Sequence, residues 1–206
     1  MPDWMAGLAE RIDAGHGSEL GRFTPPQGTP TRAGAVLILF GEGAGGPDVL
    51  LIERAADMRS HAGQPAFPGG AIDPGDDGPV AAALREAEEE TGLDPAGVQV
   101  VAALPDLWLP PSGFAVTPVL GYWRRPVPVR AVDPREVARA ERVPVAELVD
   151  PANRVMVVHP SGYRGPGFQV ADMLVWGFTA MLLDRLLDLS GWALPWPRER
   201  EVSVPL

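Results

Sequence analysis

The order of apolar and polar positions along the chain predicts several strands. Ala33–Phe40 (AGAVLILF) is a continuous apolar run with β-branched content, which is typical of a buried strand. The turn-forming stretch GEGAGGPD follows, and Val49–Ile52 then resumes the apolar pattern, so the two segments predict a hairpin. Four further segments are expected to be strands: Val98–Leu104, Phe114–Trp123, Val155–Val158 and Phe168–Val170.

Helical spacing of apolar residues predicts two longer helices. Pro79–Thr91 begins with a proline, which the first helical turn tolerates, and Gly92 follows at a position that suits a helix end. Val170–Leu189 is the longest predicted helix and carries an apolar stripe. Three shorter helices are expected at Pro2–Ala14, Pro134–Ala140 and Val145–Leu148. This order of elements favours an α/β or α+β architecture over a repeating parallel fold.

The chain of 206 residues is long enough to bury one full hydrophobic core, and we find no internal repeat or dividing linker. Residues 1–31 are expected to form a helix and a connector, residues 32–192 the main domain, and residues 193–206 a tail. The first residues lack the apolar core of a signal peptide, and no run of 18 apolar residues occurs. We therefore expect a cytoplasmic protein with no membrane partner.

The charge balance narrows the range of partners. A formal net charge of −10 argues against a general nucleic-acid-binding or anionic-membrane surface, because both require broad positive fields. A small phosphate-bearing ligand is compatible with this charge, since a bound metal can reverse the sign of the local field. The absence of cysteine excludes disulfides and thiolate metal sites, and it fits a reducing compartment.

Three glutamates gather on one face of the helix predicted over Pro79–Thr91. At about 100° per residue, Glu89 and Glu90 lie roughly 60° and 40° on opposite sides of Glu86, whereas Glu88 points away. Like charges at this spacing repel by roughly a few tenths of a kcal/mol per pair, and a divalent cation would remove that repulsion. Carboxylate oxygens without His or Cys favour Mg²⁺, with Mn²⁺ second. A solvent-exposed glutamate face without function is the alternative, because runs of charge commonly lie on surfaces.

The segment around this helix resembles the Nudix box. The stretch GGAIDPGDDGPVAAALREAEEETGL (residues 69–93) is similar to the pattern G-x5-E-x7-R-E-U-x-E-E-x-G-U, where U is aliphatic. Six positions of its second half match: Arg85, Glu86, Glu89, Glu90, Gly92 and Leu93. Ala87 stands at an aliphatic position, Asp76 replaces the first glutamate, and one additional residue follows Asp76. The resemblance implies a Nudix fold, an α/β/α sandwich with a mixed central sheet, that hydrolyses a diphosphate linkage.

The sequence before the box is similar to the signature of the coenzyme A pyrophosphatase branch of this family. That signature runs LLTxRSxxxRxxxGxxxFPGG, with Leu also allowed for Thr and Ala for Ser. This chain has Leu50–Ala55 (LLIERA), Arg59, Gly63 and Phe67–Gly70, with isoleucine at the third position as a mild departure. The resemblance covers roughly Arg32–Trp192. It implies hydrolysis of coenzyme A or acyl-CoA to 3′,5′-ADP and a phosphopantetheine product.

For the metal site, the resemblance implies that Glu86, Glu89 and Glu90 bind Mg²⁺ or Mn²⁺. Nudix enzymes differ in their general base: some use the first glutamate of this trio, and others use a glutamate on a later loop. The matching residues here are Glu86 and Glu136, with Glu141 as a weaker rival. The base is therefore one of these glutamates, and the sequence leaves the choice open.

For the substrate, Arg54 and Arg59 are expected to contact phosphate oxygens, because a guanidinium offers a fixed fork of donors. Ion pairing with nearby acids is the alternative for both. Gly69 and Gly70 would let the backbone approach the ligand, and Phe67 belongs to the same substrate-binding segment.

Several neighbouring residues have a less specific expectation. Arg85 is expected to orient the carboxylates of the metal site through hydrogen bonds without contacting the metal itself. His61 lies in the signature loop, where it either touches substrate or forms an ordinary hydrogen bond. Trp108 and Phe114 are candidates to stack on an adenine or to line a pantetheine channel. The alternative is packing in the core or at its rim, which is the commoner case for aromatic residues.

Two other functions fit the same residues less well. Hydrolysis of ADP-ribose or a dinucleoside polyphosphate is the alternative within the class. A non-catalytic module that senses nucleotides is the alternative outside it, but degenerate metal positions would be its mark, and the three glutamates are intact. The apolar C-terminal helix is expected either to pack within the fold or to form a homodimer face.

Overall fold

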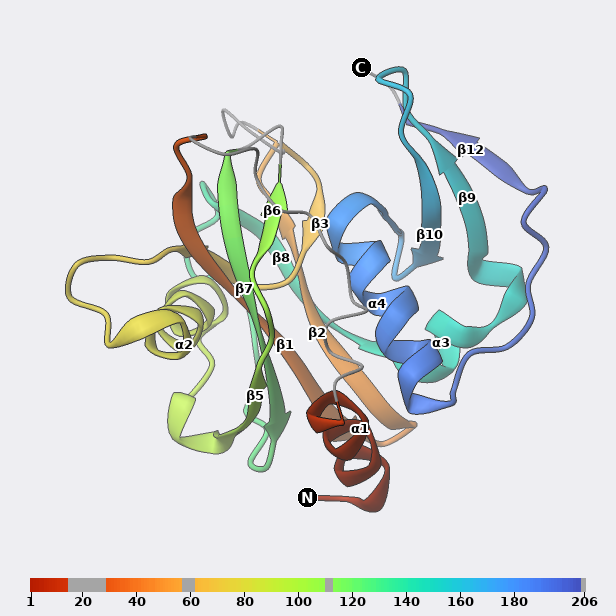
Figure 1. Ribbon diagram of the computed structural model, residues 1–206. Helices are drawn as coiled ribbons and strands as arrows, with labels where there is room; N and C mark the ends of the chain where they lie inside the picture. Colours follow the sequence, from red (N-terminus) through yellow and green to blue (C-terminus); the bar gives the residue numbers. More distant parts are fainter. Residues whose placement is uncertain (15–28, 57–61, 110–112, 205–206) are drawn as a thin grey trace.

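A mixed sheet forms the centre of the fold in the computed structural model, which describes residues 1–14, 29–56, 62–109 and 113–204 (Figure 1). Its strands in this part of the chain are β1 (Arg32–Gly43), β2 (Gly46–Arg54), β3 (Pro65–Ala66), β4 (Gly69–Ala71), β5 (Val98–Ala103), β6 (Leu107–Leu109), β7 (Phe114–Trp123) and β8 (Val137–Pro144). The main path has the order β3-β2-β1-β7-β5, with β4 beside β1, β6 beside β7 and β8 beside β2. The sheet is mixed because β1 runs parallel to β7 and antiparallel to β2 and β4.

Helices and a smaller sheet surround this centre. The helices are α1 (Asp3–Asp13), α2 (Gly78–Thr91), α3 (Val145–Val149) and α4 (Gly177–Ser190), with the short 3₁₀ turns η2 (Pro95–Gly97) and η3 (Pro151–Asn153). No helix among the described residues has the length and apolar character needed to cross a bilayer. The smaller sheet has the order β11-β10-β9-β12 and consists of β9 (Arg154–Val158), β10 (Arg164–Val170), β11 (Met173–Val175) and β12 (Glu201–Ser203).

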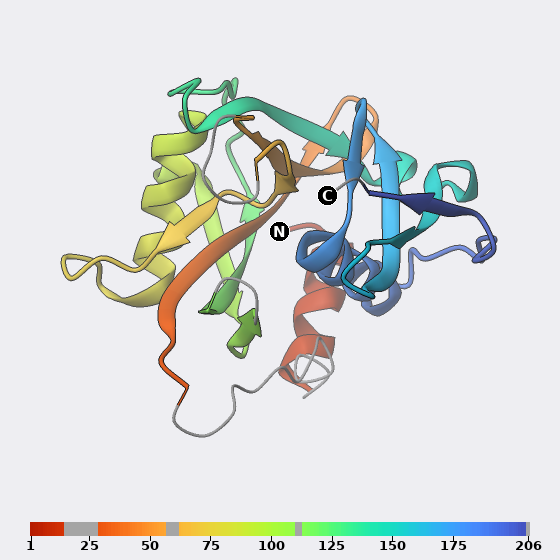
Figure 2. The same ribbon diagram turned by 90° about the horizontal axis from the view of Figure 1, so that it is seen from above.

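Strand β1 is buried on both faces, which explains its unbroken apolar run. Leu37 and Leu39 pack against α2 on one face of the sheet. Ile38 and Phe40 pack against α1 and α4 on the other face, and the smaller sheet lies beyond α4 (Figures 1 and 2). The predicted α/β/α sandwich with a mixed central sheet is therefore confirmed. The apolar stripe of α4 packs within the chain, with Leu186 only 1% exposed.

Most of the predicted elements are confirmed. The hairpin of β1 and β2, the strands β5, β7, β9 and β10, and the helices α1, α2 and α3 all lie where the sequence pattern places them, within a few residues at their ends. Two segments differ from the prediction. In both, pairing with a neighbouring strand decides the conformation.

Residues 134–140 are not helical, so that prediction is wrong. Residues 134–136 form a turn, and β8 begins at Val137 and runs antiparallel to β2. Val137 and Val143 are fully buried, whereas the residues between them are partly or fully exposed, which places this segment on an outer strand rather than a helix. An ion pair between Arg139 on β8 and Glu53 on β2 stabilises the pairing.

The helix predicted over Val170–Leu189 begins only at Gly177. Met173–Val175 instead forms β11, which pairs antiparallel with β10. The turn between these strands contains Ala171 and Asp172, whose φ angles of 49° and 55° belong to the left-handed region. Two consecutive residues in this region make the tight turn that a hairpin prefers. The apolar residues before Gly177 therefore belong to a sheet.

The segments expected to flank the main domain both contact it. In α1, Met5, Leu8 and Ile12 are buried in the cluster that also holds α4. In the expected tail, β12 pairs in parallel with β9, with Val202 opposite Val157. The helix α1 thus covers apolar surface of the fold, and β12 extends the smaller sheet.

The packing of α1 gives a test of its contribution to stability. Leu8 is 1% exposed, so Leu8→Ala is expected to lower the free energy of unfolding by about 2–5 kcal/mol through lost burial and the cavity it leaves. Urea denaturation followed by tryptophan fluorescence would measure this change. Glu10→Ala, at an exposed position of the same helix, is the control and should change stability by less than about 0.5 kcal/mol. Equal stability of the two variants would contradict the docking of α1.

Candidate active site

Strand β4 brings peptide backbone against the glutamate face of α2. Gly70 on β4 lies opposite Ala35 on β1, and α2 packs beside both strands. A Cβ atom at Gly69 would lie 2.3 Å from the Ala35 carbonyl oxygen, and one at Gly70 would lie 2.5 Å from the carboxyl carbon of Glu86. Gly69 therefore requires glycine because its neighbour is backbone, whereas a Cβ at Gly70 would displace the end of the Glu86 side chain. The backbone of β4 thus lies against the glutamates of α2, and its expected approach to a ligand stays a prediction.

Helix α2 lies close to the sheet because small side chains form its inner face. Ala82, Ala83 and Ala87 are completely buried there. Gly92 ends the helix with a φ of 71°, and its N–H donates to the carbonyl oxygen of Glu88 at 2.9 Å. The Glu88 side chain is exposed, in agreement with the helical geometry expected from the sequence.

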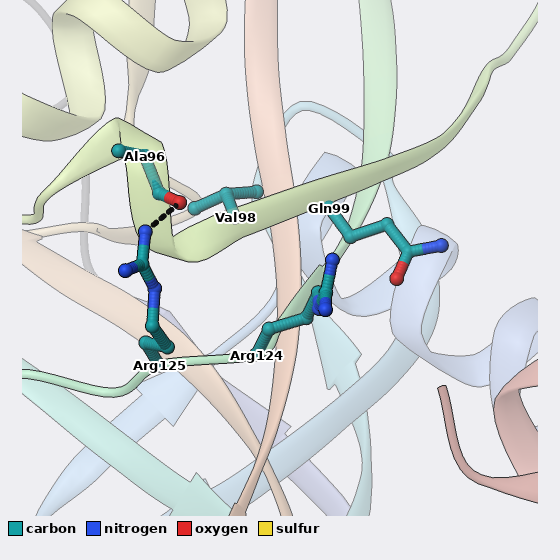
Figure 3. Close-up of a pocket in the computed structure, with 5 residues that line it drawn as sticks. All are labelled: Ala96, Val98, Gln99, Arg124 and Arg125. Atoms are coloured by element: carbon teal, nitrogen blue, oxygen red, sulfur yellow. Dashed lines mark hydrogen bonds between the residues drawn. The ribbon is translucent and has the colours of Figure 1, made fainter.

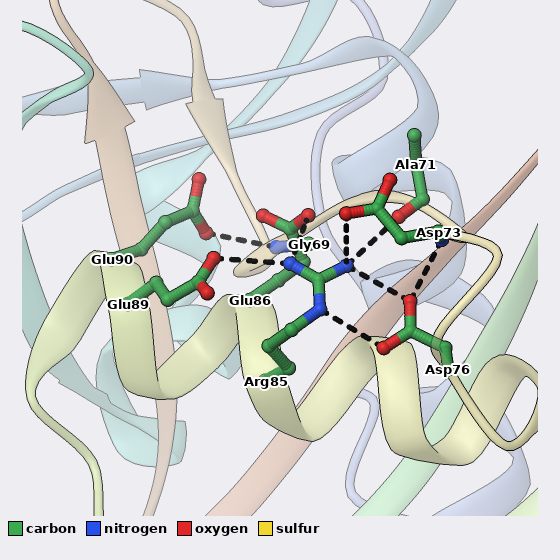
Figure 4. Close-up of polar contacts among 8 residues, drawn as sticks. All are labelled: Gly69, Ala71, Asp73, Asp76, Arg85, Glu86, Glu89 and Glu90. Carbon is green, nitrogen blue, oxygen red and sulfur yellow. Dashed lines mark hydrogen bonds and ion pairs between the residues drawn. The ribbon is translucent and has the colours of Figure 1, made fainter.

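The Arg85 guanidinium joins the carboxylates of α2 to the loop before it (Figure 4). Nε and Nη2 each donate to one carboxylate oxygen of Asp76 at 3.0 Å, and Nη2 also donates to the Ala71 carbonyl oxygen at 3.1 Å. Nη1 donates to both Glu86 and Glu89 at 3.0 Å. Arg85 therefore holds two of the three glutamates and positions the helix against β4.

Asp76 has a structural role that the sequence pattern does not predict. Its carboxylate accepts two hydrogen bonds from Arg85 and one from the Asp73 N–H at 2.8 Å. The hydrogen bonds from Arg85 hold the pKa of Asp76 below its usual range, and the Asp73 N–H acts in the same direction. In the sequence, Asp76 is marked only as an aspartate at a position where the Nudix box has glutamate, with one additional residue before Arg85. That pattern locates Asp76 but does not predict its bidentate contact with Arg85.

Glu90 is the most buried of the three glutamates, with 6% of the residue exposed. Its Oε2 accepts a hydrogen bond from the Gly69 N–H at 2.9 Å. Burial raises the pKa of Glu90 to about 8, and the charges of Glu86 and Glu136 act in the same direction. The Gly69 hydrogen bond and the charge of Arg54 oppose that rise. Burial is also the main cause that raises the pKa of Glu86.

Arg54 and Glu136 lie at the same end of the sheet as Glu90. Arg54 ends β2, and the next residue, Ala55, donates its N–H to the Glu136 carbonyl oxygen at 2.9 Å. The Arg54 Nε atom is buried and has no hydrogen-bond partner among the described residues. Glu141 pairs with Leu51, whose side chain faces α4, so Glu141 lies on the face of the sheet away from α2. The structure thus brings Arg54 and Glu136, but not Glu141, to the glutamate face.

The other predicted contact residues have different surroundings. Phe67 is 2% exposed and packs in the core on the α4 side of the sheet. Phe114 stacks under the Arg32 guanidinium at 4.3 Å, while the Nε1 atom of Trp108 is buried without a partner in the described part of the chain. Arg59 and His61 lie outside the described residues.

The donors around Glu90 have the chemistry of a hard-cation site. Glu86, Glu89 and Glu90 supply only carboxylate oxygens, and neither histidine nor cysteine stands among them, which suits Mg²⁺ or Mn²⁺ rather than zinc. In the described residues no three acidic or histidine side chains already converge on one point, because Glu86 and Glu89 face Arg85 and Glu90 faces the Gly69 N–H. A cation would replace contacts that these carboxylates now make within the protein.

Comparison with known proteins identifies the family. The model of the NUDIX domain matches residues 30–159. An uncharacterized Nudix hydrolase NudL of Cronobacter sakazakii is 42% identical over 147 residues, which are 68% of this chain and 73% of that protein. The corresponding protein of Escherichia coli K12 is 38% identical over the same shares. Among solved structures, a Nudix hydrolase from M. smegmatis, RenU, superposes with a TM-score of 0.56 at 23% identity, covering 81% of this chain and 90% of RenU.

The chain therefore belongs to the Nudix hydrolase family. Members of this family bind nucleotide substrates and generally use divalent metals such as Mg²⁺. The solved structure supports the fold, and the family match extends over β1 to β9, which includes α2 and all of its glutamates.

The contact between Gly70 and Glu86 predicts the effect of one added methyl group. In Gly70→Ala the new Cβ would displace the Glu86 carboxylate, and hydrolysis of the protein's substrate is expected to fall about 100-fold, since displacements near 1 Å have effects of that size. Gly75→Ala is the matched control, because a Cβ at Gly75 meets no atom within 4 Å. Steady-state kinetics beside thermal melting would compare them. Full activity in Gly70→Ala would contradict the assigned position of Glu86.

Proposed function

We propose that this Nudix hydrolase cleaves the diphosphate linkage of a nucleoside diphosphate derivative in a Mg²⁺-dependent reaction, with coenzyme A or acyl-CoA as its substrate. The products are 3′,5′-ADP and phosphopantetheine or its acyl derivative. The observation that carries the proposal is the single face of α2 on which Glu86, Glu89 and Glu90 stand beside the backbone of Gly69 and Gly70 (Figure 4). An oxygen-rich face of this kind suits a cation bound together with phosphate groups.

In this proposal Glu86, Glu89 and Glu90 hold Mg²⁺, for which Mn²⁺ can substitute. When bound, the cation neutralises charge on the phosphate oxygens and lowers the pKa of a water molecule. The positive charge also offsets the repulsion among three carboxylates on neighbouring turns. Arg85 retains its bidentate contact with Asp76 and keeps α2 in place against β4.

The substrate phosphates are assigned to the arginines. Arg54 is supported by its buried Nε atom, which has no hydrogen-bond partner in the described part of the chain, and by its electrostatic effect on Glu90. A phosphate oxygen is a suitable acceptor for such a group, because an unpaired buried donor is costly. Arg59 is assigned by the resemblance alone. The backbone of Gly69 and Gly70 would lie along the diphosphate.

The reaction adds water to one phosphorus atom while the bond from that atom to the bridging oxygen breaks, and the proton of the water passes to a general base. Glu136 is our first candidate for this base, because its side chain is exposed and its charge reaches Glu90. Glu86 is the second candidate. Its carboxylate accepts a hydrogen bond from Arg85 and is assigned to the metal in this proposal, which leaves it less free to accept a proton.

The choice of coenzyme A rests on the segment Leu50–Gly70, which resembles the coenzyme A pyrophosphatase signature. The experiment is product analysis by mass spectrometry with Mg²⁺ on coenzyme A, ADP-ribose and diadenosine polyphosphates. We expect coenzyme A to be turned over with the highest kcat/KM and to yield 3′,5′-ADP. A preference for ADP-ribose or a dinucleotide would replace the substrate assignment, and tight binding without turnover of any compound would remove the proposed activity.

Glu90→Gln tests the metal site in the same assay. We expect at least a 100-fold loss of kcat, because a neutral amide replaces one carboxylate ligand. The metal-free variant should be no less stable than the wild type at pH 9, since it avoids burying a charge at a group whose pKa is about 8. Glu88→Gln is the control and should retain full activity, because Glu88 is exposed on another face. Undiminished turnover by Glu90→Gln would refute the metal assignment.

The general base is tested by a matched pair of variants. Glu136→Gln should lower kcat about 100-fold or more and remove the acidic limb of the pH–rate profile, as expected for loss of a general base. Glu141→Gln should leave both unchanged, because Glu141 lies on the opposite face of the sheet. A normal pH profile in Glu136→Gln would transfer the role to Glu86.

A further inference from the structure

A hollow on the protein surface lies where η2 meets the end of β7 (Figure 3). Its volume is about 480 Å³, and it is lined by Ala96, Val98, Gln99, Arg124 and Arg125. The candidate active site does not include any of these residues. The volume falls in the range of pockets that bind small molecules.

The hollow is separate from the glutamate face. Thr117 on β7 pairs with Ala35 on β1, and Ala35 pairs with Gly70 on β4, so these three residues lie level across the sheet. Trp123 ends β7 beside the hollow, six residues beyond Thr117. At about 3.3 Å per residue, that stretch of strand separates the two places by roughly 20 Å. The hollow is therefore not part of the glutamate face.

The backbone around the hollow is held by specific contacts. The Gly97 carbonyl oxygen accepts hydrogen bonds from the N–H groups of Arg124 at 2.9 Å and Arg125 at 3.2 Å. A Cβ atom at Gly97 would lie 2.7 Å from the Arg125 carbonyl oxygen, so this approach needs a glycine. The backbone of Arg124 and Arg125, from which both side chains extend, is thus held against η2.

The charge in the hollow is positive and incompletely paired. Arg125 donates from Nη2 to the Ala96 carbonyl oxygen at 2.7 Å, whereas the Arg124 guanidinium lies on the side nearer Gln99 (Figure 3). No ion pair to Arg124 or Arg125 occurs among the residues that the structure describes. The nearby Asp94 carboxylate accepts a hydrogen bond from the Ala96 N–H at 3.0 Å. A local excess of guanidinium charge therefore persists in a chain whose net charge is −10.

We propose that this hollow binds a small molecule through a phosphate group, at a site separate from the active site. Two guanidinium groups offer the fork of donors that phosphate oxygens accept, and the Gln99 amide can add a further donor. Val98 and Ala96 give a short apolar wall beside the charge. The volume exceeds what one inorganic phosphate fills, so a phosphate monoester the size of a nucleotide is the expected ligand.

The test titrates the metal-free chain of 206 residues with inorganic phosphate and with adenosine 5′-monophosphate. Calorimetry would give the affinity, and ¹⁵N NMR would give the position. We expect the monophosphate to bind and to shift the amide signals of Gly97, Gln99 and Arg124. Arg124→Gln should weaken binding about tenfold or more, as expected for one charge-assisted hydrogen bond.

Arg130→Gln is the matched control, because Arg130 is exposed on the same segment but does not line the hollow. It should leave the affinity within about twofold, and thermal melting would check that each variant is folded. Binding of inorganic phosphate with the same sensitivity to Arg124→Gln also supports the site and identifies the free ion as a ligand. The proposal is overturned if neither compound binds, if Arg130→Gln weakens binding equally, or if the shifted signals lie in Gly69–Glu90.

Discussion

The contacts of the Arg85 guanidinium join three parts of the molecule that the chain connects only through a loop and a helix. Its nitrogen atoms reach Asp76 in the loop, the Ala71 carbonyl oxygen at the end of β4, and two glutamates of α2, each within about 3 Å. A guanidinium is planar and its donors have fixed directions, so these contacts define the orientation of the helix as well as its distance. The position of each candidate metal ligand follows from that orientation.

The same arrangement has a cost in stability, which Glu90 shows most clearly. The alanine face of α2 draws the helix onto the sheet, and that approach leaves Glu90 almost without solvent. A buried carboxylate with one backbone hydrogen bond and a neighbouring glutamate is unfavourable as an isolated structural choice. Groups of this kind are typical of functional sites, where local stability is given up for binding or chemistry.

The sequence predicts most of this architecture because the signals are long and local. The helix with its glutamates and the apolar strands of the sheet follow from periodicity, and the Nudix box follows from fixed spacing. The prediction fails at Pro134–Ala140 and Met173–Val175, where short segments acquire their conformation from the strands beside them, β2 and β10. The conformation of such segments depends on which strand they pair with in the folded protein, and the local sequence pattern does not contain that information.

The candidate site divides in a similar way. Glu86, Glu89 and Glu90 could be assigned from helix geometry because one helix carries all three. The neighbourhood of Arg54 and Glu136 could not, since it depends on the pairing of two strands whose residues are more than 80 positions apart. The contact of Asp76 with Arg85 depends on the path of a loop, and spacing alone does not give that path.

The place of α1 in the fold has a consequence for biosynthesis. Its buried residues share a cluster with α4, and Arg11 donates a hydrogen bond to the Leu189 carbonyl oxygen, 178 positions later. By contrast, Gly69 and Glu90 are only 21 positions apart. A ribosome releases the chain from its amino-terminal side, so the segment with the glutamates of α2 emerges well before α1 can contact α4. The apolar face of α1 can meet Ile38 and Phe40 of β1 early, whereas its contacts with α4 cannot form until α4 has left the exit tunnel. The contacts between α1 and α4 therefore form late in biosynthesis, and a chaperone would have its main opportunity to bind the apolar face of α1 before they do.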